Sequence, residues 1–202
     1  MDREKQIQRF FKACGNGNLI LLKELKKTNN LTDKDARSYN NEALKQACFY
    51  GHTSTAKWLV ETFKLTAEDA RSQNNSALIY ACACGHTSTA QWLLDTYYTV
   101  EDARSERNKA FRHACAGGHT PTAQWLIKTF TLTIEDVRLE DNFALKRACL
   151  NSHTSTAQWL LDTYYTVEDA LEMSKSLYIS REMKEWLQNY EPLGAFTKPV
   201  QM

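Results

Sequence analysis

Apolar residues recur along most of the chain at helical spacing, and the pattern restarts every 33 or 34 residues. One such unit opens at Asn41, places Ala43, Leu44 and Cys48 on one helical face, and closes at Gly51. Residues three and four apart share one side of an α-helix, and glycine often follows the last helical residue. The pattern therefore predicts a helix of about nine residues with Asn41 as its N-cap.

A second helix is expected to begin just after the glycine, with Thr53 as its N-cap. At 100° per residue, the apolar and small side chains of residues 55–63 cover an arc of roughly 200°. Only Ser54, Lys57 and Glu61 face outward. So wide an apolar arc predicts a helix that packs between two neighbours, as in a stack.

A third start signal follows in the stretch Thr66-Ala-Glu-Asp69. It resembles a capping box with Asp in place of Glu, and it predicts a short helical turn in the return segment. Asp69, Arg71 and their equivalents are expected to form solvated ion pairs that connect the return loops. The joint before this signal alternates between a longer and a shorter form, which indicates duplication of a two-repeat block.

The repeats are counted most simply from an Ala-Cys pair. The pairs stand at Ala13-Cys14, Ala47-Cys48, Ala81-Cys82, Ala114-Cys115 and Ala148-Cys149, in steps of 34, 34, 33 and 34 residues. Short helices repeated at this period each expose an apolar face, which only stacking can bury. The sequence predicts an all-α helical-repeat solenoid: five repeats of two short antiparallel helices and a C-terminal capping helical segment.

The expected organisation is a single domain over residues 1–190. Its repeats span about 4–37, 38–71, 72–104, 105–138 and 139–171, and the cap spans 172–190. Residues 191–202 are expected to form a flexible tail.

The unit resembles an ankyrin repeat. In the stretch 76–86, the leucine, the small pair and Gly-His stand where the ankyrin pattern T-P-L-H-x-A-x-x-x-G-H has its own, while Ala77 and Ile79 replace the Pro and His. The resemblance covers about residues 4–172. It implies a protein-binding scaffold or adaptor whose first helices and return loops line a concave face. Divergent arrays of this kind resemble those of protists, giant DNA viruses and intracellular bacterial effectors. The Thr-x-Glu-Asp insert leaves open whether the return loops form β-hairpin fingers or short helices.

Composition narrows the function classes. Lys and Arg number 25 and Asp and Glu 24, so the near-neutral chain lacks the basic excess typical of nucleic-acid binders. No apolar run is long enough to cross a membrane. Six cysteines without a signal sequence indicate reduced thiols and an intracellular, cytoplasmic location. No cofactor motif is present, so no cofactor is expected.

Cys82, Cys84 and His86 are three possible metal ligands close together in sequence. Equivalent residues of a stack lie about 8–10 Å apart, too far for a shared zinc ion or a disulfide. The histidines 52, 86, 119 and 153 are therefore predicted to have structural roles. Cys84 beside His86 is the one local candidate for catalysis, and the chain is expected not to be an enzyme. An enzyme or enzyme fragment using Cys84, and a purely structural spacer, stay as alternatives.

Positions that differ between the copies point to a binding surface on the first helices, although neutral drift on a solvated face is the simpler alternative. The predicted partner-binding residues are Lys45, Phe49, Tyr50, Ile79, Tyr80, Ala83, Cys84, Arg107, Arg112, His113, Lys146, Arg147 and Leu150. The face is largely apolar and aromatic in the second and third copies, at Phe49, Tyr50, Ile79 and Tyr80, and it turns basic in the fourth and fifth. This gradient predicts a monomer that binds an unidentified protein segment with a hydrophobic end and an acidic end, with no nucleic acid and no membrane as partner.

Overall fold

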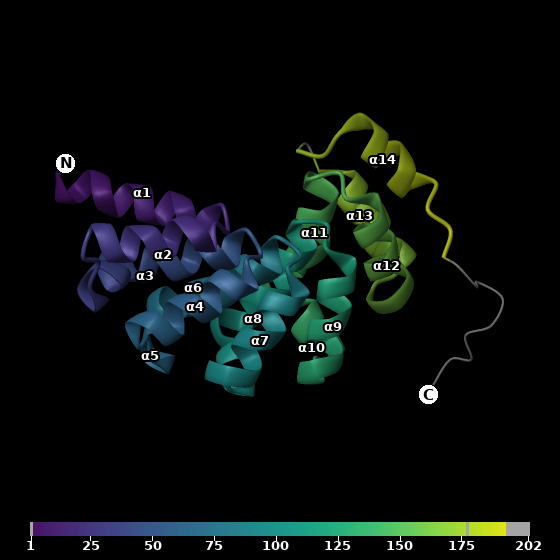
Figure 1. Ribbon diagram of the computed structural model, residues 1–202. Coiled ribbons are helices and arrows are strands. Elements are labelled where there is room, and N and C mark those ends of the chain that lie inside the picture. Colours follow the sequence, from purple (N-terminus) through teal and green to yellow (C-terminus); the bar gives the residue numbers. More distant parts are fainter. Residues whose placement is uncertain (1, 177, 193–202) are drawn as a thin grey trace.

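A computed structural model of the chain describes residues 2–176 and 178–192, and it shows a curved stack of helices without strands in these ranges (Figure 1). The helices are α1 (Arg3–Gly15), α2 (Leu19–Thr28), α3 (Asp33–Phe49), α4 (Thr53–Phe63), α5 (Ala67–Ala70), α6 (Ser72–Ala83), α7 (Thr87–Tyr97), α8 (Val100–Ala116), α9 (Thr120–Phe130), α10 (Ile134–Val137), α11 (Leu139–Leu150), α12 (Thr154–Tyr164), α13 (Val167–Ser174) and α14 (Arg181–Gln188).

Five two-helix repeats follow one another along the stack. The first helices are α1, α3, α6, α8 and α11, and each packs against the next in this order. The second helices are α2, α4, α7, α9 and α12. This arrangement confirms the predicted all-α solenoid. At the C-terminal end α13 packs against α14, which buries Met183 and Leu187, and the Tyr190 hydroxyl donates to Asp162 Oδ1 of α12 at 2.7 Å. Most of the predicted tail, from residue 193 on, lies outside the described residues.

The repeated cysteines line the core as predicted. Cys14, Cys48, Cys82, Cys115 and Cys149 are all buried free thiols, whereas Cys84 is half-buried. Burial raises the pKa of Cys48 to about 12, so this thiol stays protonated and acts as a small apolar side chain.

The predicted capping boxes are present at the start of every return turn. In each, the threonine side chain accepts from the backbone N–H of the aspartate three residues on, and the aspartate accepts from the backbone N–H of the threonine; the threonines are Thr32, Thr66, Thr99, Thr133 and Thr166. The return segments of the described residues thus contain short helical turns, which settles the choice between helices and β-hairpin fingers.

The same aspartates also join neighbouring repeats. Arg37 pairs with Asp69 at 3.1 Å, Arg71 with Asp102 at 2.8 Å, and Arg104 with Asp136 at 2.5 Å; Arg3 and Asp35, and Arg138 and Asp169, form the two end rungs. The ion-pair ladder was expected, but its rungs run from one repeat to the next and are partly buried. Each carboxylate therefore caps a helical turn and holds the preceding repeat at the same time.

The start of the first helices differs from the prediction. Within α3, α6, α8 and α11, three consecutive residues have left-handed backbone angles that kink the helix; in α3 these are Tyr39, Asn40 and Asn41, with φ of 52°, 56° and 60°. The predicted N-cap at Asn41 is wrong, because the backbone is not extended there and Oδ1 has no hydrogen-bond partner. Asparagine tolerates the left-handed region better than most residues. Its equivalent Asn108 instead donates to Asp136 of the next repeat at 3.0 Å.

The predicted N-cap threonines also have another role. His52 holds the N-cap position of α4 without a side-chain cap, and Thr53 is the first helical residue. The Thr53 hydroxyl lies 2.7 Å from the Thr89 hydroxyl of the next repeat. The same bond joins Thr87 to Thr122 and Thr120 to Thr156, each at 2.7 Å. The threonines thus connect second helices across the repeat boundary.

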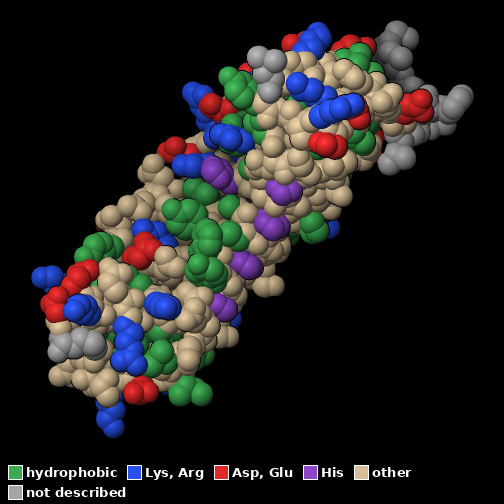
Figure 2. Space-filling view, turned by 90° about the horizontal axis from the view of Figure 1, so that it is seen from above, with side chains coloured by type: hydrophobic (Ala, Val, Ile, Leu, Met, Phe, Trp, Pro, Cys, Tyr) green, Lys and Arg blue, Asp and Glu red, His purple; other side chains and the backbone are tan. Residues whose placement is uncertain are grey.

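The Gly-His turns behave as the sequence indicates. Gly51 has a φ of 74°, and Ser152, which replaces glycine in the fifth repeat, is held at 57°. A Cβ atom on Gly51 would lie 2.4 Å from His86 Nδ1, so each histidine ring packs directly on the glycine of the preceding repeat. The histidines form a row along one face (Figure 2), which confirms their structural role.

The alternating joints fill the same space in two ways. In the longer joint, Lys64 takes a left-handed conformation with φ of 51° and Leu65 is buried. In the shorter joint, Tyr98 is extended and buried, and its hydroxyl donates to the Ala70 carbonyl. The longer joint therefore buries a leucine that follows a left-handed residue, and the shorter joint buries a tyrosine in the same place without a left-handed residue.

Candidate protein-binding surface

The N-terminal half of the first-helix face carries an aromatic cluster, which we define as Phe49, Tyr50 and Tyr80. Their exposed fractions are 40%, 52% and 39%. The Phe49 ring meets the Tyr50 ring edge-on at 4.9 Å and the Tyr80 ring at 5.8 Å between centroids. A row of hydrophobic side chains is visible on this face beside the histidines (Figure 2). The cluster joins α3 to α6 and leaves apolar area open to a ligand.

Two shallow hollows extend this cluster toward the N-terminus. One, of about 340 Å³, is lined by the cluster together with Glu42, Lys45 and Gln46. The other, of about 590 Å³, shares Glu42 and Gln46 and reaches Phe11 and Tyr39. The first three repeats therefore present two neighbouring hollows, each lined in part by aromatic side chains.

Two residues predicted to contact a partner are buried in the structure. Ile79 is 6% exposed and belongs to the core. Lys45 is 7% exposed, and its ammonium donates to Gln73 Oε1 at 2.8 Å and pairs with Glu42 at 2.9 Å. Their position on the first helix faces the left-handed loop of the return segment, so they cannot serve as exposed contacts.

The C-terminal half of the face carries the Phe143 cluster, which we define as Phe143, Lys109, Arg112, His113 and Arg147. The Arg112 and Arg147 guanidinium carbons lie 4.8 and 5.2 Å from the Phe143 ring centroid, and the His113 ring lies 6.2 Å from it. The cluster joins α8 to α11. Sequence reasoning missed Phe143, although it is the one hydrophobic residue at a repeat position otherwise held by Gln8, Glu42, Ser76 and Lys109.

The cations of this half differ in how far they are already engaged. Arg112 donates to the carbonyls of Glu106 and Arg107, both at 2.9 Å, and so fastens the left-handed loop. Arg107 pairs with Glu140, and Lys146 with Asp141. Lys109 and Arg147 form no ion pair with the described side chains, so their charge is available to a ligand.

Positive charge dominates around His113. Burial lowers the pKa of His113, and the charges of Lys109, Arg112 and Arg147 lower it further. The imidazole is therefore mainly neutral at pH 7 and faces a positive field. An anion placed in this cluster would be attracted by that field.

Between the two clusters the surface is formed by small residues. Ala83 ends α6 and Cys84 follows it; Ala116 ends α8 and Gly117 follows it. All four residues are half-buried. A Cβ atom on Gly117 would lie 2.3 Å from the Ala83 carbonyl oxygen. Because the backbones at Ala83 and Gly117 approach so closely, no large side chain projects from this part of the face.

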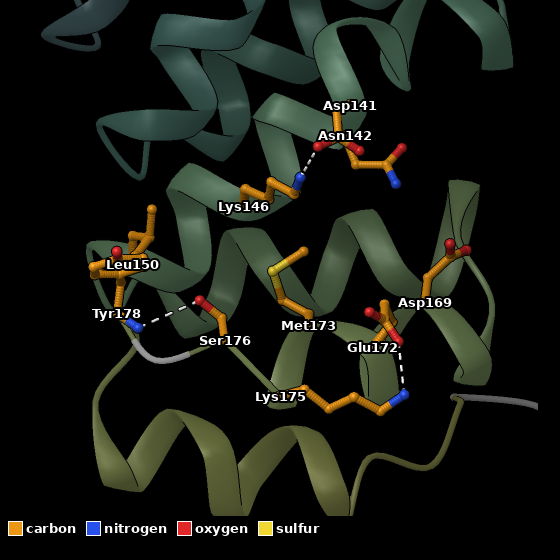
Figure 3. Close-up of a pocket in the computed structure, with 10 residues that line it drawn as sticks. All are labelled: Asp141, Asn142, Lys146, Leu150, Asp169, Glu172, Met173, Lys175, Ser176 and Tyr178. Atoms are coloured by element: carbon orange, nitrogen blue, oxygen red, sulfur yellow. Dashed lines mark hydrogen bonds and ion pairs between the residues drawn. The ribbon is translucent and has the colours of Figure 1, made fainter.

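A third hollow, of about 550 Å³, lies beyond the Phe143 cluster, between α11 and the C-terminal cap (Figure 3). Leu150, predicted as a contact, lines it together with Met173 and Tyr178. The charged side chains at its rim are neutralised in pairs, Lys146 by Asp141 and Lys175 by Glu172. This hollow continues the face to the end of the last repeat.

The chemistry of Cys84 does not favour catalysis. Burial raises the pKa of its thiol, whereas a nucleophilic cysteine needs a lowered pKa. Among the described residues, no group of His, Cys, Asp and Glu side chains is arranged to hold a metal ion. Nor does this part of the chain contain a helix with the length and apolarity needed to cross a membrane.

Comparison with known proteins agrees with the repeat architecture. Residues 10–104 match the family model described as ankyrin repeats in three copies. The fold is similar to the human ASB11 ankyrin repeat domain, with a TM-score of 0.62 and 21% identity over 88% of this chain and 81% of that one. No curated protein matches the sequence. Ankyrin repeat domains generally mediate protein–protein interactions and are typically non-catalytic. From the repeat pattern, the stacked two-helix units and these matches, the chain has the fold of an all-α ankyrin-repeat solenoid.

Proposed function

We propose that this chain is a scaffold or adaptor that binds a segment of a partner protein, as a monomer, along the face of its first helices. The observation that carries the proposal is the pairing of two unlike features on one face. Exposed aromatic rings occupy the second and third repeats, and the fourth and fifth contribute Lys109 and Arg147, which form no ion pair with the side chains that the structure describes. A segment with a hydrophobic end and an acidic end complements both.

The aromatic cluster supplies the anchor of this interface. Aromatic side chains are enriched in protein-binding surfaces and account for much of the binding free energy. Phe49 and Tyr80 are each more than one-third exposed, yet they are held edge-on by their neighbours. A preorganised apolar surface loses little entropy on binding, so a leucine or aromatic side chain of the partner gains affinity here.

The Phe143 cluster supplies orientation. Arg147 is exposed, lies over the Phe143 ring and offers its guanidinium to a carboxylate in a forked geometry. Lys109 adds a second available charge. Arg112 contributes to the field but already fastens the Glu106 and Arg107 carbonyls. A change of charge at Arg147 therefore tests binding without removing a hydrogen bond to the loop.

The two alternatives have less support. A Cys84 enzyme would need a thiolate, and the raised pKa of this thiol opposes one. A structural spacer has no use for three large side chains exposed side by side, because grouped apolar surface promotes association.

The proposal is tested by capturing partners with the folded chain, identifying them by mass spectrometry, and measuring the purified partner by calorimetry. We expect Phe49→Ala with Tyr80→Ala to weaken binding by about 100-fold, as loss of two anchors does. Arg147→Glu should weaken binding about 10-fold and reduce its salt dependence.

Lys128→Glu is the matched control, because Lys128 is an exposed residue of the second helix α9 and carries the same charge change. Thermal unfolding of each variant checks that the fold is kept. Equal affinity of all variants for the purified partner would show that this face is not the site.

A further inference from the structure

The two clusters of the binding face lie two repeats apart. The aromatic cluster connects α3 and α6, and the Phe143 cluster connects α8 and α11. Packed helices have axes about 8–10 Å apart. The centres of the two clusters are therefore separated by about 16–20 Å along the stack.

The surface between the clusters is low enough for a peptide backbone. Ala83, Cys84, Ala116 and Gly117 are all small, and the contact of Gly117 with the Ala83 carbonyl leaves no room for a larger residue at 117. A helical ligand has a diameter of about 10–12 Å with its side chains, so its own side chains would hold its backbone away from so shallow a floor. An extended chain can lie directly on it.

We infer that a single extended segment of the partner occupies both clusters at once and crosses the face over Cys84. This inference rests on the proposed function and specifies its ligand. An extended chain advances about 3.3 Å per residue, so about five or six residues separate the hydrophobic anchor from the acidic group. A helix would need about twelve residues for the same span.

A series of peptides measures this separation. Each fluorescein-labelled peptide carries Trp-Leu, a Ser/Gly spacer and Asp-Glu-Glu, with spacers of about two, five, eight or eleven residues. Fluorescence anisotropy should give the tightest binding for the five-residue spacer. Its affinity should exceed that of the two-residue spacer by about 10-fold or more, because only the longer spacer lets both ends bind together.

Cys84 reports the path of the peptide. It is the one cysteine of the six that is not buried, so a maleimide reacts with it selectively under native conditions. A saturating amount of the five-residue-spacer peptide should slow this alkylation by about 5-fold or more, since the bound chain covers the thiol. Cys84→Trp should bind more weakly.

Three results would overturn the inference. They are an affinity that does not depend on spacer length, a preference for the eleven-residue spacer, and an unchanged alkylation rate at saturation. In each case the proposed function stands if Arg147→Glu and the aromatic double variant still weaken peptide or partner binding. If these variants have no effect on any ligand, the proposed function fails as well.

Discussion

The hydrogen bond between Thr87 and Thr122 gives a sharp test of how the repeats are joined. Thr122 is 1% exposed, whereas Thr87 is half-buried, and their hydroxyls lie 2.7 Å apart. Thr87→Val leaves the Thr122 hydroxyl buried without its partner, which costs about 1–3 kcal/mol. Thr122→Val leaves a hydroxyl that water can reach, so the loss is nearer 0.5–1.5 kcal/mol, roughly that of one hydrogen bond. The double variant removes both polar groups and should be nearly neutral.

The chain contains its own control for this cycle. Helices α7 and α12 have identical sequences, so Thr154 is the counterpart of Thr87. Thr154 is exposed, and the described helices that follow it, α13 and α14, form the cap and not a further repeat that could supply a partner. Thr154→Val should change the free energy of unfolding by less than about 0.5 kcal/mol. Urea unfolding followed by tryptophan fluorescence gives these values, and each kcal/mol corresponds to about 2–4 °C in Tm for a chain of this size. The reasoning is refuted if Thr87→Val costs no more than Thr154→Val, or if the two single losses simply add in the double variant.

Three further predictions concern the thiols, acid and the loops. Native alkylation followed by mass spectrometry should modify Cys84 well before the five buried cysteines, and equal rates would contradict the packing role of the buried thiols. Stability should fall in two stages on acidification. A group whose pKa is lower in the folded than in the unfolded chain stabilises the fold at higher pH, and this contribution is lost as the pH falls and the group is protonated. Burial and the neighbouring His153 and His86 lower the pKa of His119, so the first stage lies below about pH 6.5, and His119→Gln should diminish it in unfolding measurements. Partial burial acts to raise the pKa of Asp69, but hydrogen bonds from Thr66 and Arg37 lower it overall, so the second stage lies below about pH 4. The loss of stability in this stage should be smaller in Asp69→Asn than in the unchanged protein. Finally, Thr131→Gly should raise the free energy of unfolding by about 1 kcal/mol, because the exposed, β-branched Thr131 that follows α9 is held at a φ of 50°, which glycine reaches without strain; a loss of stability would contradict this.

Sequence reasoning located the features that local chemistry specifies. The capping boxes, the Gly51 turn and the buried cysteines follow from short-range signals, since each depends on residues a few positions apart. The threonine bonds did not follow, because an N-cap and an inter-repeat hydroxyl pair use the same residue type at the same place. Only the distance between repeats separates the two possibilities. The left-handed loops were also missed, since three successive residues other than glycine rarely adopt that conformation.

Variation between copies proved an ambiguous guide to function. One variable position of the first helix shows why; in successive repeats it holds Lys45, Ile79, Arg112 and Lys146. Lys45 and Arg112 donate to backbone carbonyls of the left-handed loop, Lys146 pairs with Asp141 within it, and Ile79 packs into the core. The position varies because several side chains can support one loop, so its variety reflects the scaffold. The adjacent position, which holds Tyr80, His113 and Arg147, varies without such a duty at Tyr80 and Arg147. The side chains of the variable face therefore fall into two groups: one supports the left-handed loop, and the other is exposed beyond it. We propose that the second group binds the ligand.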